Sequence, residues 1–313
     1  MATLKDVAKL ACVDVSTVSR ALNNTSYVHP DTKARIFAAV KELSYQPNVL
    51  AQGLRQGKRH TIGVVVPRLQ FTVFGEIVKS IEQTAQKLGY ATLISTTEES
   101  AKVERETLSR LRNGFVDGII LAGTGANGRL VRDISSVVAD YEACAHDGTM
   151  FLADKGCMEI GLINGSMDIA PYLARYKGYK KAIAKRELPE ITTTCTHPWN
   201  SFEYGYQCAG QLLDENPKLD AIMAAVDVQG LGAMRAIKER GLRVPEDIRL
   251  VSLTGHKVGG MLETSMTSLE VPAREMGEKV TKMLIEEIEA PSDQKPSPQH
   301  LVFAARLVER EST

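Results

Sequence analysis

Five residues near the N-terminus have side chains with which proteins read DNA: Val15, Ser16, Thr17, Ser19 and Arg20. An arginine can donate two hydrogen bonds to one guanine, and serine or threonine can reach phosphates and base edges. Valine can contact a thymine methyl group. These side chains must share the outer face of one helix to enter a major groove. The same pattern fits the polar face of an ordinary three-helix bundle, so the residues alone leave both interpretations open.

Three short helices that share one core are predicted to position this face. Thr3 can cap the first helix, Asp14 can cap the second, and Pro30 begins the third. The first two helices are separated by Cys12-Val13, a tight turn, which is the helix-turn-helix plan. Apolar residues recur at helical spacing in each helix: Leu4, Val7, Ala8, Leu10 and Ala11; then Val15, Val18, Ala21 and Leu22; then Ile36, Phe37, Val40 and Leu43.

Charge is unevenly distributed along the 313 residues, although the net charge is zero. Residues 1–60 contain nine Lys and Arg against four Asp and Glu, a net charge of +5, which leaves −5 for the remainder. A basic segment on an acidic body favours a polyanionic partner for that segment. The N-terminal apolar positions are interrupted by charges, unlike a signal peptide, and no apolar run approaches the ~18 residues of a membrane span. A cytoplasmic protein is therefore expected.

Residues 4–24, LKDVAKLACVDVSTVSRALNN, closely resemble the DNA-binding signature of the lac repressor (LacI/GalR) family of bacterial transcriptional regulators. The match is dense, lies at the expected N-terminal place, and continues through the rest of the chain. It implies a nucleoid-associated protein whose second helix enters the major groove. Two residues depart from the signature: Cys12 replaces the usual turn glycine, and Asp14 replaces the usual serine cap. A left-handed backbone at Cys12 would cost about 1–2 kcal/mol.

Residues 45–55, YQPNVLAQGLR, resemble the hinge of the same family. The resemblance implies that this hinge folds into a short helix on the operator, and that Leu54 wedges between base pairs in the minor groove. Gly53 costs a helix about 1 kcal/mol relative to alanine, so a reluctant hinge helix is expected. The DNA-binding set that the resemblance completes is Thr3, Val15, Ser16, Thr17, Ser19, Arg20, Asn23, His29, Ala51, Leu54 and Arg55.

From Thr61 onward the pattern changes to alternating strands and helices. Because such alternation indicates parallel sheets covered on both faces, an α/β fold is predicted. The expected fold class is an N-terminal all-α helix-turn-helix domain followed by two doubly wound parallel-sheet lobes, which resemble periplasmic sugar-binding proteins. Apolar strand segments are predicted at residues 62–67, 91–96, 116–123, 159–165, 191–196, 221–226 and 248–253.

The expected domain boundaries are 1–46 for the helix-turn-helix, 47–59 for the hinge, 60–141 with 272–301 for the N-lobe, and 142–271 with 302–313 for the C-lobe. The family resemblance implies a further strand and loop near Ser135, where this sequence runs directly into SVVADY. About one strand and its loop are absent, judged by ordinary lengths. Either the N-lobe lacks a strand or the sequence omits a segment. A lost strand would weaken that lobe.

Sugar binding requires planar hydrogen-bonding groups for hydroxyl pairs and an aromatic face for the ring. Open α/β lobes present such groups at the carboxyl ends of their strands. Three positions meet this requirement and match family positions: Arg175 as effector clamp, Asp227 as acceptor from hydroxyls, and Trp199 as stacking aromatic. Phe74, in the loop after the first strand, and Asp140 are weaker additions. A salt bridge for Arg175 and Asp227, and core packing for Trp199, are the alternatives.

No pattern of catalytic, metal-binding or cofactor-binding residues is found, so a non-enzymatic protein without a cofactor is expected. Residues 123–128 spell G-x-G-x-x-G, but they follow the third strand, whereas a dinucleotide site uses the first strand–helix unit. The six histidines are scattered and the five cysteines form no C-x-x-C pair. Reduced thiols are expected rather than disulfides or a zinc site.

These features predict a repressor of a carbohydrate-utilisation operon that binds a palindromic operator as a homodimer and is switched by a sugar or sugar phosphate. The resemblance implies dimer contacts on the helix at about 75–88 and near residues 230–240 and 256–263. A change in the angle between the lobes would alter the spacing of the two hinges. A family regulator with a purine or phosphoprotein co-repressor remains an alternative. A solute-binding transport protein is disfavoured by the helix-turn-helix.

Overall fold

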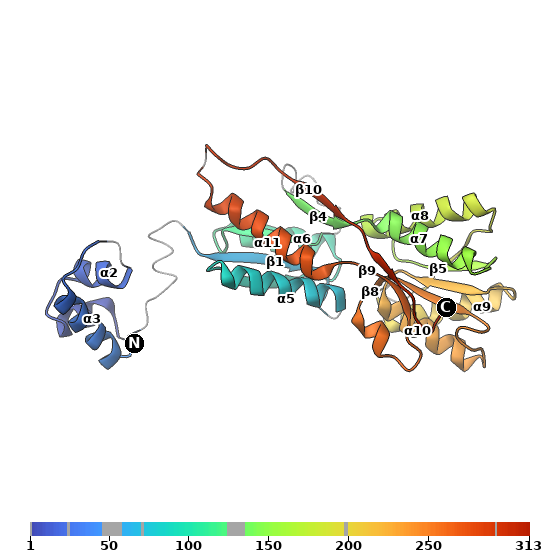
Figure 1. The fold of residues 1–313 in the computed structure, drawn as a ribbon, viewed down its shortest axis with the longest axis horizontal. Coiled ribbons are helices and arrows are strands. Elements are labelled where there is room, and N and C mark those ends of the chain that lie inside the picture. The colour runs from blue at the N-terminus through green and yellow to red at the C-terminus, as the bar shows by residue number, and fades with distance from the viewer. Residues whose placement is uncertain are drawn as a thin grey trace. The chain divides into compact units, whose positions relative to one another are not determined.

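The computed structural model describes residues 2–23, 26–45, 58–69, 72–123, 135–196, 200–291 and 293–313. The chain divides into two compact units, Met1–Arg59 and His60–Thr313 (Figure 1). The first unit is helical, and the second alternates strands with helices. The predicted fold class is confirmed. The predicted hinge lies almost wholly outside the described residues.

The first unit is a small helical bundle. Its described helices pack around one cluster of buried side chains, to which each helix contributes. Thr3 and Asp6 form a capping box at the start of the first helix, so the backbone N–H groups there are satisfied. The helices are α1 (Leu4–Leu10), α2 (Val15–Asn23) and α3 (Pro30–Glu42), and the buried residues are Val7, Ala8, Ala11, Val18, Ala21, Ile36 and Ala39.

The turn between α1 and α2 has the backbone conformation that is expected at this position of the sequence. Cys12 has a φ of 51°, which is the left-handed conformation expected where a glycine usually stands. Three of the apolar positions are exposed: Leu10, Val15 and Phe37. The outer face was expected for Val15, whereas Leu10 and Phe37 were expected on the apolar faces of their helices. Leu10 is the last residue of α1. Phe37 follows the fully buried Ile36, and a step of about 100° around a helix turns it to the outer face.

The first part of the second unit, here named the N-lobe, contains a parallel sheet in the order β2-β1-β3. Successive residues of β1 face opposite sides of the sheet, and different helices cover the two sides. Ile62 and Val64 pack with Ile81 of α5 and Ile285 of α11, whereas Gly63 lies against α6. The elements are β1 (Thr61–Val66), α5 (Thr72–Lys87), β2 (Ala91–Thr96), α6 (Ala101–Arg112), β3 (Gly118–Leu121) and α11 (Ala273–Glu289).

Two further N-lobe strands form a separate ribbon. Strand β4 (Ser136–Ala139) pairs in parallel with β10 (His300–Phe303). Among the described residues, β3 pairs with β1 alone and β4 with β10 alone, so no hydrogen bonds join the ribbon to the three-stranded sheet. Residues 124–134, between β3 and β4, lie outside the described residues, so the expected loss of a strand near Ser135 stays a prediction. Strand β10 runs to Phe303, past the boundary expected at residue 301.

The remaining part, here named the C-lobe, has one continuous sheet. Its described strands follow the order β11-β9-β8-β7-β5-β6, and β11 alone among them runs antiparallel to its neighbour. The strands are β5 (Ile160–Ile163), β6 (Ile191–Thr193), β7 (Ala221–Ala224), β8 (Arg249–Gly255), β9 (Thr267–Glu270) and β11 (Arg306–Val308). The helices are α7 (Tyr141–Asp154), α8 (Ala170–Arg186), α9 (Phe202–Glu215), α10 (Asp227–Glu239) and the short η2 (Lys257–Met261).

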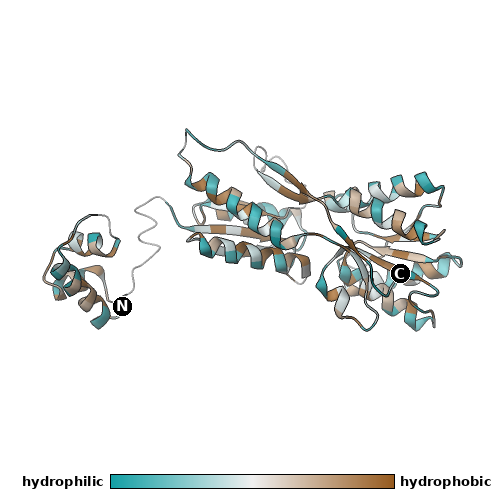
Figure 2. Cartoon of the chain, viewed as in Figure 1, coloured by the Kyte–Doolittle hydropathy of each residue, from teal (hydrophilic) through white to brown (hydrophobic). Residues whose placement is uncertain are grey.

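Helices cover both faces of the C-lobe sheet, and each face has its own core. Side chains of α7 and α8, such as Leu152 and Tyr179, pack with Met223 of β7 on one face. Side chains of α9 and α10, such as Leu212 and Ile237, pack with the opposite face. Figure 2 shows this pattern as hydrophobic strands between helices whose outer surfaces are mostly hydrophilic. Strands buried on both faces explain why the sequence shows nearly continuous apolar runs there.

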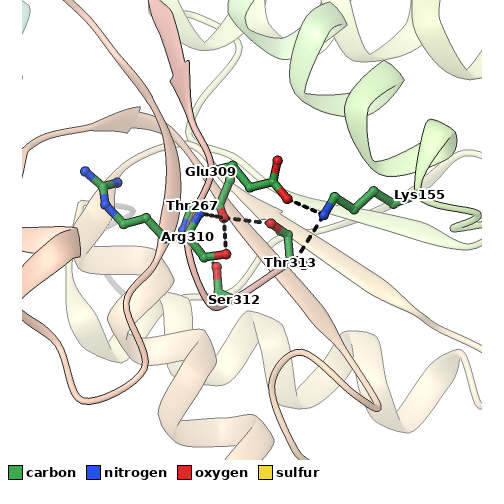
Figure 3. A network of polar contacts seen from close by, with 6 residues as sticks. All are labelled: Lys155, Thr267, Glu309, Arg310, Ser312 and Thr313. Carbon is green, nitrogen blue, oxygen red and sulfur yellow. Dashed lines mark hydrogen bonds and ion pairs between the residues drawn. The ribbon is translucent and has the colours of Figure 1, made fainter.

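The C-terminal residues are tied to the C-lobe by hydrogen bonds (Figure 3). The N–H of Thr267 donates to Ser312 Oγ at 2.8 Å, and the N–H of Arg310 donates to Thr267 Oγ1 at 2.9 Å. Lys155, just after α7, forms an ion pair with Glu309 and donates to a carbonyl oxygen of Thr313 at 3.3 Å. These contacts join the end of the chain to β9 and α7.

Candidate functional site

The outer face of α2 carries the residues predicted to read DNA. Val15, Ser16 and Arg20 are exposed, whereas Thr17 and Ser19 are half-buried beside the bundle core. Arg20 lies along its own helix: Nε donates to the carbonyl oxygen of Ser16 at 3.3 Å, and Nη2 donates to Ser16 Oγ at 3.2 Å. A guanine can replace these weak intrahelical contacts with two charge-assisted ones.

The other predicted DNA contacts are distributed around this face. Thr3 donates its hydroxyl to Asp6 at 2.7 Å as part of the capping box, so its side chain is already engaged in the fold. Asn23 Nδ2 donates to Ser19 Oγ at 3.4 Å, and His29 stands exposed immediately before α3. Ala51, Leu54 and Arg55 lie outside the described residues.

Arg175, the predicted effector clamp, is buried in the C-lobe among polar and aromatic neighbours. Its Nη2 donates to Thr254 Oγ1, and its guanidinium carbon lies 4.4 Å from the ring centre of Tyr141 and 5.3 Å from that of Tyr172. Burial raises the pKa of both phenols, so both rings stay neutral against the cation. In the described part of the chain, Nε of Arg175 has no hydrogen-bond partner.

A close helix crossing brings Tyr141 to Arg175. Gly178, one turn beyond Arg175 on α8, faces the backbone of α7, and a Cβ there would lie 2.0 Å from the carbonyl oxygen of Glu142. Only a glycine permits this approach. Tyr141 begins α7, so the crossing places its ring against the guanidinium.

Asp227, the second predicted effector ligand, begins α10 directly after the strand β7. It is buried, and its Oδ2 accepts a hydrogen bond from the N–H of His256 at 3.0 Å. His256 follows β8, the strand that also supplies Thr254 to Arg175. The structure thus brings Arg175 and Asp227 to the carboxyl ends of adjoining strands, where open α/β sheets bind ligands.

A polar network at the same place joins the two lobes. Tyr172 OH donates to Asn200 Oδ1, and both residues contact Glu99 of the N-lobe: Tyr172 OH at 3.5 Å and Asn200 through its Nδ2. Tyr172 is also one of the two rings against Arg175. Nearby in the N-lobe, Arg68 pairs with Glu98 at 3.0 Å. Hydrogen-bonding groups from both lobes therefore meet at this place.

The three remaining predicted effector residues have different surroundings. Phe74 lies in the first turn of α5, not in a loop, because α5 already begins at Thr72, and it packs against the N-lobe core. Asp140 caps α7: its Oδ1 accepts from the N–H of Ala143 at 2.9 Å. Trp199 lies outside the described residues.

Five site residues were missed in the sequence analysis: Glu99, Tyr141, Tyr172, Asn200 and Thr254. A signal existed for Tyr172, since residues three apart on a helix share a face and Tyr172 precedes Arg175 by that spacing. The other four come from separate elements, which the fold alone brings together.

Three segments of the chain match described families. Residues 3–48 match bacterial regulatory proteins of the lacI family. Residues 59–142 match the periplasmic binding proteins and sugar binding domain of the LacI family, and residues 149–313 match a periplasmic binding protein-like domain. The helical unit and the lobes thus each match in the predicted order.

Individual relatives extend over the whole chain. The ribose operon repressor of Halalkalibacterium halodurans is 32% identical over 329 aligned positions, which cover 100% of this chain and 97% of that protein. The chain belongs to the lacI family. The repressor PurR of Yersinia pestis is 27% identical, with 100% of this chain and 97% of that protein covered. The lac repressor dimer bound to operator and the anti-inducer ONPF superimposes with a TM-score of 0.88, at 26% identity and 100% and 99% coverage.

As a member of the lacI family, the chain is a metabolite-responsive transcriptional repressor. Repressors of this family bind operator DNA and small-molecule effectors, and the family members are regulators rather than enzymes. In the described part of the chain no helix combines the length and apolar character that crossing a membrane requires.

The alignment also measures how much shorter this lacI-family chain is. Because the 329 aligned positions include at most 313 residues of this chain, at least 16 positions have no residue here. The family match to the first part of the second unit ends at residue 142 and the next begins at residue 149, shortly after β4 in the sequence.

Proposed function

We propose that this repressor controls a carbohydrate-utilisation operon, binds a palindromic operator as a homodimer, and responds to a sugar or sugar phosphate held between its lobes. The observation that carries the effector part is the placement of Arg175 and Asp227 at neighbouring strand ends of the C-lobe. Arg175 offers hydrogen-bond donors and Asp227 offers a hydrogen-bond acceptor. Paired hydroxyl groups of a sugar require both kinds of group. The ribose operon repressor among the relatives supports a sugar.

The DNA part of the proposal rests on α2. Val15, Ser16 and Arg20 lie exposed on one short helix whose other face is packed into the bundle. We place this helix in the major groove and the hinge, residues 47–55, in the minor groove of the operator. A homodimer supplies two such helices for two half-sites. The lac repressor dimer on its operator supports this arrangement.

The switch couples the two sites through the lobes. Glu99, Tyr172 and Asn200 bridge them in the structure, so an effector that enters beside Arg175 changes contacts on both sides. A changed angle between the lobes alters the spacing of the two hinges in the dimer. Coupling of this kind is typically about 1–3 kcal/mol.

A gel shift on the DNA upstream of the protein's own gene tests the proposal, with a panel of sugars and sugar phosphates added. We expect a specific complex that one compound of the panel weakens or strengthens. Arg20→Ala should remove the specific complex and leave weak binding to random DNA. Lys218→Ala, a change on the C-lobe surface, should alter neither the specific complex nor the binding to random DNA. Equal affinity for upstream and random DNA would overturn the DNA part.

The hinge is tested separately. We expect Leu54→Ala to weaken binding to the operator while binding to random DNA and its salt dependence stay nearly constant, because phosphate contacts dominate non-specific binding. The measurement is a titration of both DNAs at several salt concentrations. An equal loss on both would count against a wedge at Leu54.

A purine effector is the second candidate. The observations that favour it are the similarity to PurR and the two tyrosine rings, Tyr141 and Tyr172, beside Arg175. Planar rings can contact a planar base. Adding adenine, guanine and hypoxanthine to the same gel shift separates the candidates, since a co-repressing purine would strengthen the operator complex.

A further inference from the structure

Glu99 occupies an unusual position between the lobes. It follows strand β2 of the N-lobe, yet its carboxylate accepts from Asn200 Nδ2 and lies 3.5 Å from Tyr172 OH, both in the C-lobe. Asn200 and Tyr172 are buried. Tyr172 in turn lies against Arg175. One tyrosine side chain therefore has Glu99 at its hydroxyl end and the predicted effector clamp at its ring.

The backbone presents Glu99 in a fixed and strained turn. Glu98 and Glu99 have φ values of 49° and 59°, in the left-handed region that residues other than glycine rarely adopt. Hydrogen bonds anchor the turn on both sides: the N–H of Glu98 donates to the carbonyl oxygen of Pro67 at 2.9 Å, and Ser100 Oγ caps α6. Strain held in place by surrounding contacts is concentrated at functional sites.

The charged side chains around this turn disfavour the binding of an anionic ligand. Two arginines described beside this network are both engaged. Arg68 pairs with Glu98 at 3.0 Å, and Arg175 donates to Thr254 between two aromatic rings. Against them stand three carboxylates: Glu98, Glu99 and the buried Asp227. A phosphate placed beside Glu99 would bring a second negative charge next to this carboxylate.

Hydrogen bonding leads to the same conclusion independently of net charge. Ionised carboxylates such as Glu99 and Asp227 accept hydrogen bonds and cannot donate them. A phosphate dianion is also an acceptor, whereas each hydroxyl group of a neutral sugar can donate. The hydroxyl groups of a polyhydroxylated ligand are therefore complementary to these carboxylates, whereas a phosphate group placed against them is not.

We propose that Glu99 determines effector specificity by making the cleft select an uncharged polyhydroxylated compound over its phosphorylated form. This deepens the proposed function and rests on its assignment of the cleft. Glu99 closes the site from the N-lobe and accepts a hydrogen bond from the bound polyol. Because it also bridges to Tyr172 and Asn200, it carries ligand recognition across the two lobes.

The test compares Glu99→Gln with the full-length parent. Glutamine keeps an acceptor oxygen for Asn200 and removes the charge, so the fold should be retained, which circular dichroism checks. Glu263→Gln is the matched control, since its side chain is 94% exposed on the C-lobe surface. The probes are inorganic phosphate, D-ribose, D-ribose 5-phosphate, D-glucose and D-glucose 6-phosphate, each measured by calorimetry.

We expect Glu99→Gln to bind inorganic phosphate roughly tenfold more tightly than the parent, because like-charge juxtaposition is removed. Where a sugar of the panel binds, its preference over the phosphorylated form should narrow by a similar factor. Glu263→Gln should match the parent. Unchanged phosphate affinity in Glu99→Gln overturns the proposal, as does a parent that prefers a sugar phosphate.

The operator gel shift distinguishes a failure of the proposed function from a failure of the specificity role proposed for Glu99. A protein that fails to bind its upstream DNA contradicts the proposed function, whatever the calorimetry shows. A protein that binds the operator normally but shows no phosphate gain in Glu99→Gln contradicts the specificity role of Glu99 alone.

Discussion

The N-lobe and C-lobe begin from the same α/β plan and differ in how completely they realise it. In the C-lobe, the described strands form one six-stranded sheet with a buried core on each face. In the N-lobe, the described strands form a three-stranded sheet and a separate ribbon of β4 and β10. Paired residues Val138 and Val302 of the ribbon are 45% and 64% exposed. Among the described strands, the N-lobe thus has fewer paired neighbours than the C-lobe and a more exposed ribbon.

The difference assigns separate tasks to the lobes. The groups predicted to hold the effector, Arg175 and Asp227, are buried in the continuous C-lobe, where packing fixes their positions. The described N-lobe contacts Tyr172 and Asn200 of the C-lobe through Glu99. A rigid lobe that binds and a looser lobe that follows is one way to convert binding into movement.

The largest expected effect concerns helix packing in the C-lobe. Gly178→Ala should destabilise the protein by roughly 3 kcal/mol, because the new Cβ would lie 2.0 Å from the carbonyl oxygen of Glu142. The matched control is Gly75→Ala in α5 of the N-lobe, where the nearest atom is 3.8 Å away. That change should stabilise its helix by up to about 1 kcal/mol. Urea denaturation measures both, and equal midpoints would contradict the packing contrast.

The next effect concerns ligand binding. Asp227→Ala should weaken effector affinity roughly 10- to 100-fold, as expected for loss of a hydrogen bond to a charged group. Operator affinity without effector should change little, because α2 lies in the other compact unit. Calorimetry and gel shift measure the two quantities. A normal response to effector would remove Asp227 from the site.

A smaller effect is expected at Asp140, which lies between β4 of the N-lobe and α7 of the C-lobe. Its carboxylate caps α7, so Asp140→Ala should lower stability by about 1 kcal/mol. Asp140→Asn should preserve most of that stability, since asparagine also caps helices. Thermal unfolding of the two variants tests the cap. If both bind effector as weakly as Asp227→Ala does, Asp140 is a ligand contact as well.

The smallest effect should be found on the exposed ribbon. Val302→Thr should change stability by less than about 0.5 kcal/mol, because its side chain is already largely in water. Val251→Thr in β8 makes the same chemical change at a fully buried position and should cost about 1–3 kcal/mol. Equal costs would mean that β10 is covered in the native protein, for instance by another copy of the chain.

Local residues were enough to predict most individual elements. Thr3 and Cys12 behave as their positions require, because capping and a left-handed turn depend on a few adjacent residues. The strand segments of the lobes were recognised because strands buried on both faces are continuously apolar. Phe37 and Phe74 were misplaced, since an apolar residue near a helix face or end can point to either side.

The sequence by itself determined the helix-turn-helix and the strands β1, β2, β3, β5, β6, β7 and β8, because each depends on residue types and spacing along the chain. The strands β4, β9, β10 and β11 were not predicted. Only the tertiary structure decided that β3 and β4 remain unpaired with each other in the described residues, and that Glu99, Tyr172 and Arg175 meet. Those contacts join residues from different elements and both lobes. Their formation depends on helix crossings such as that at Gly178, whose geometry no local pattern records.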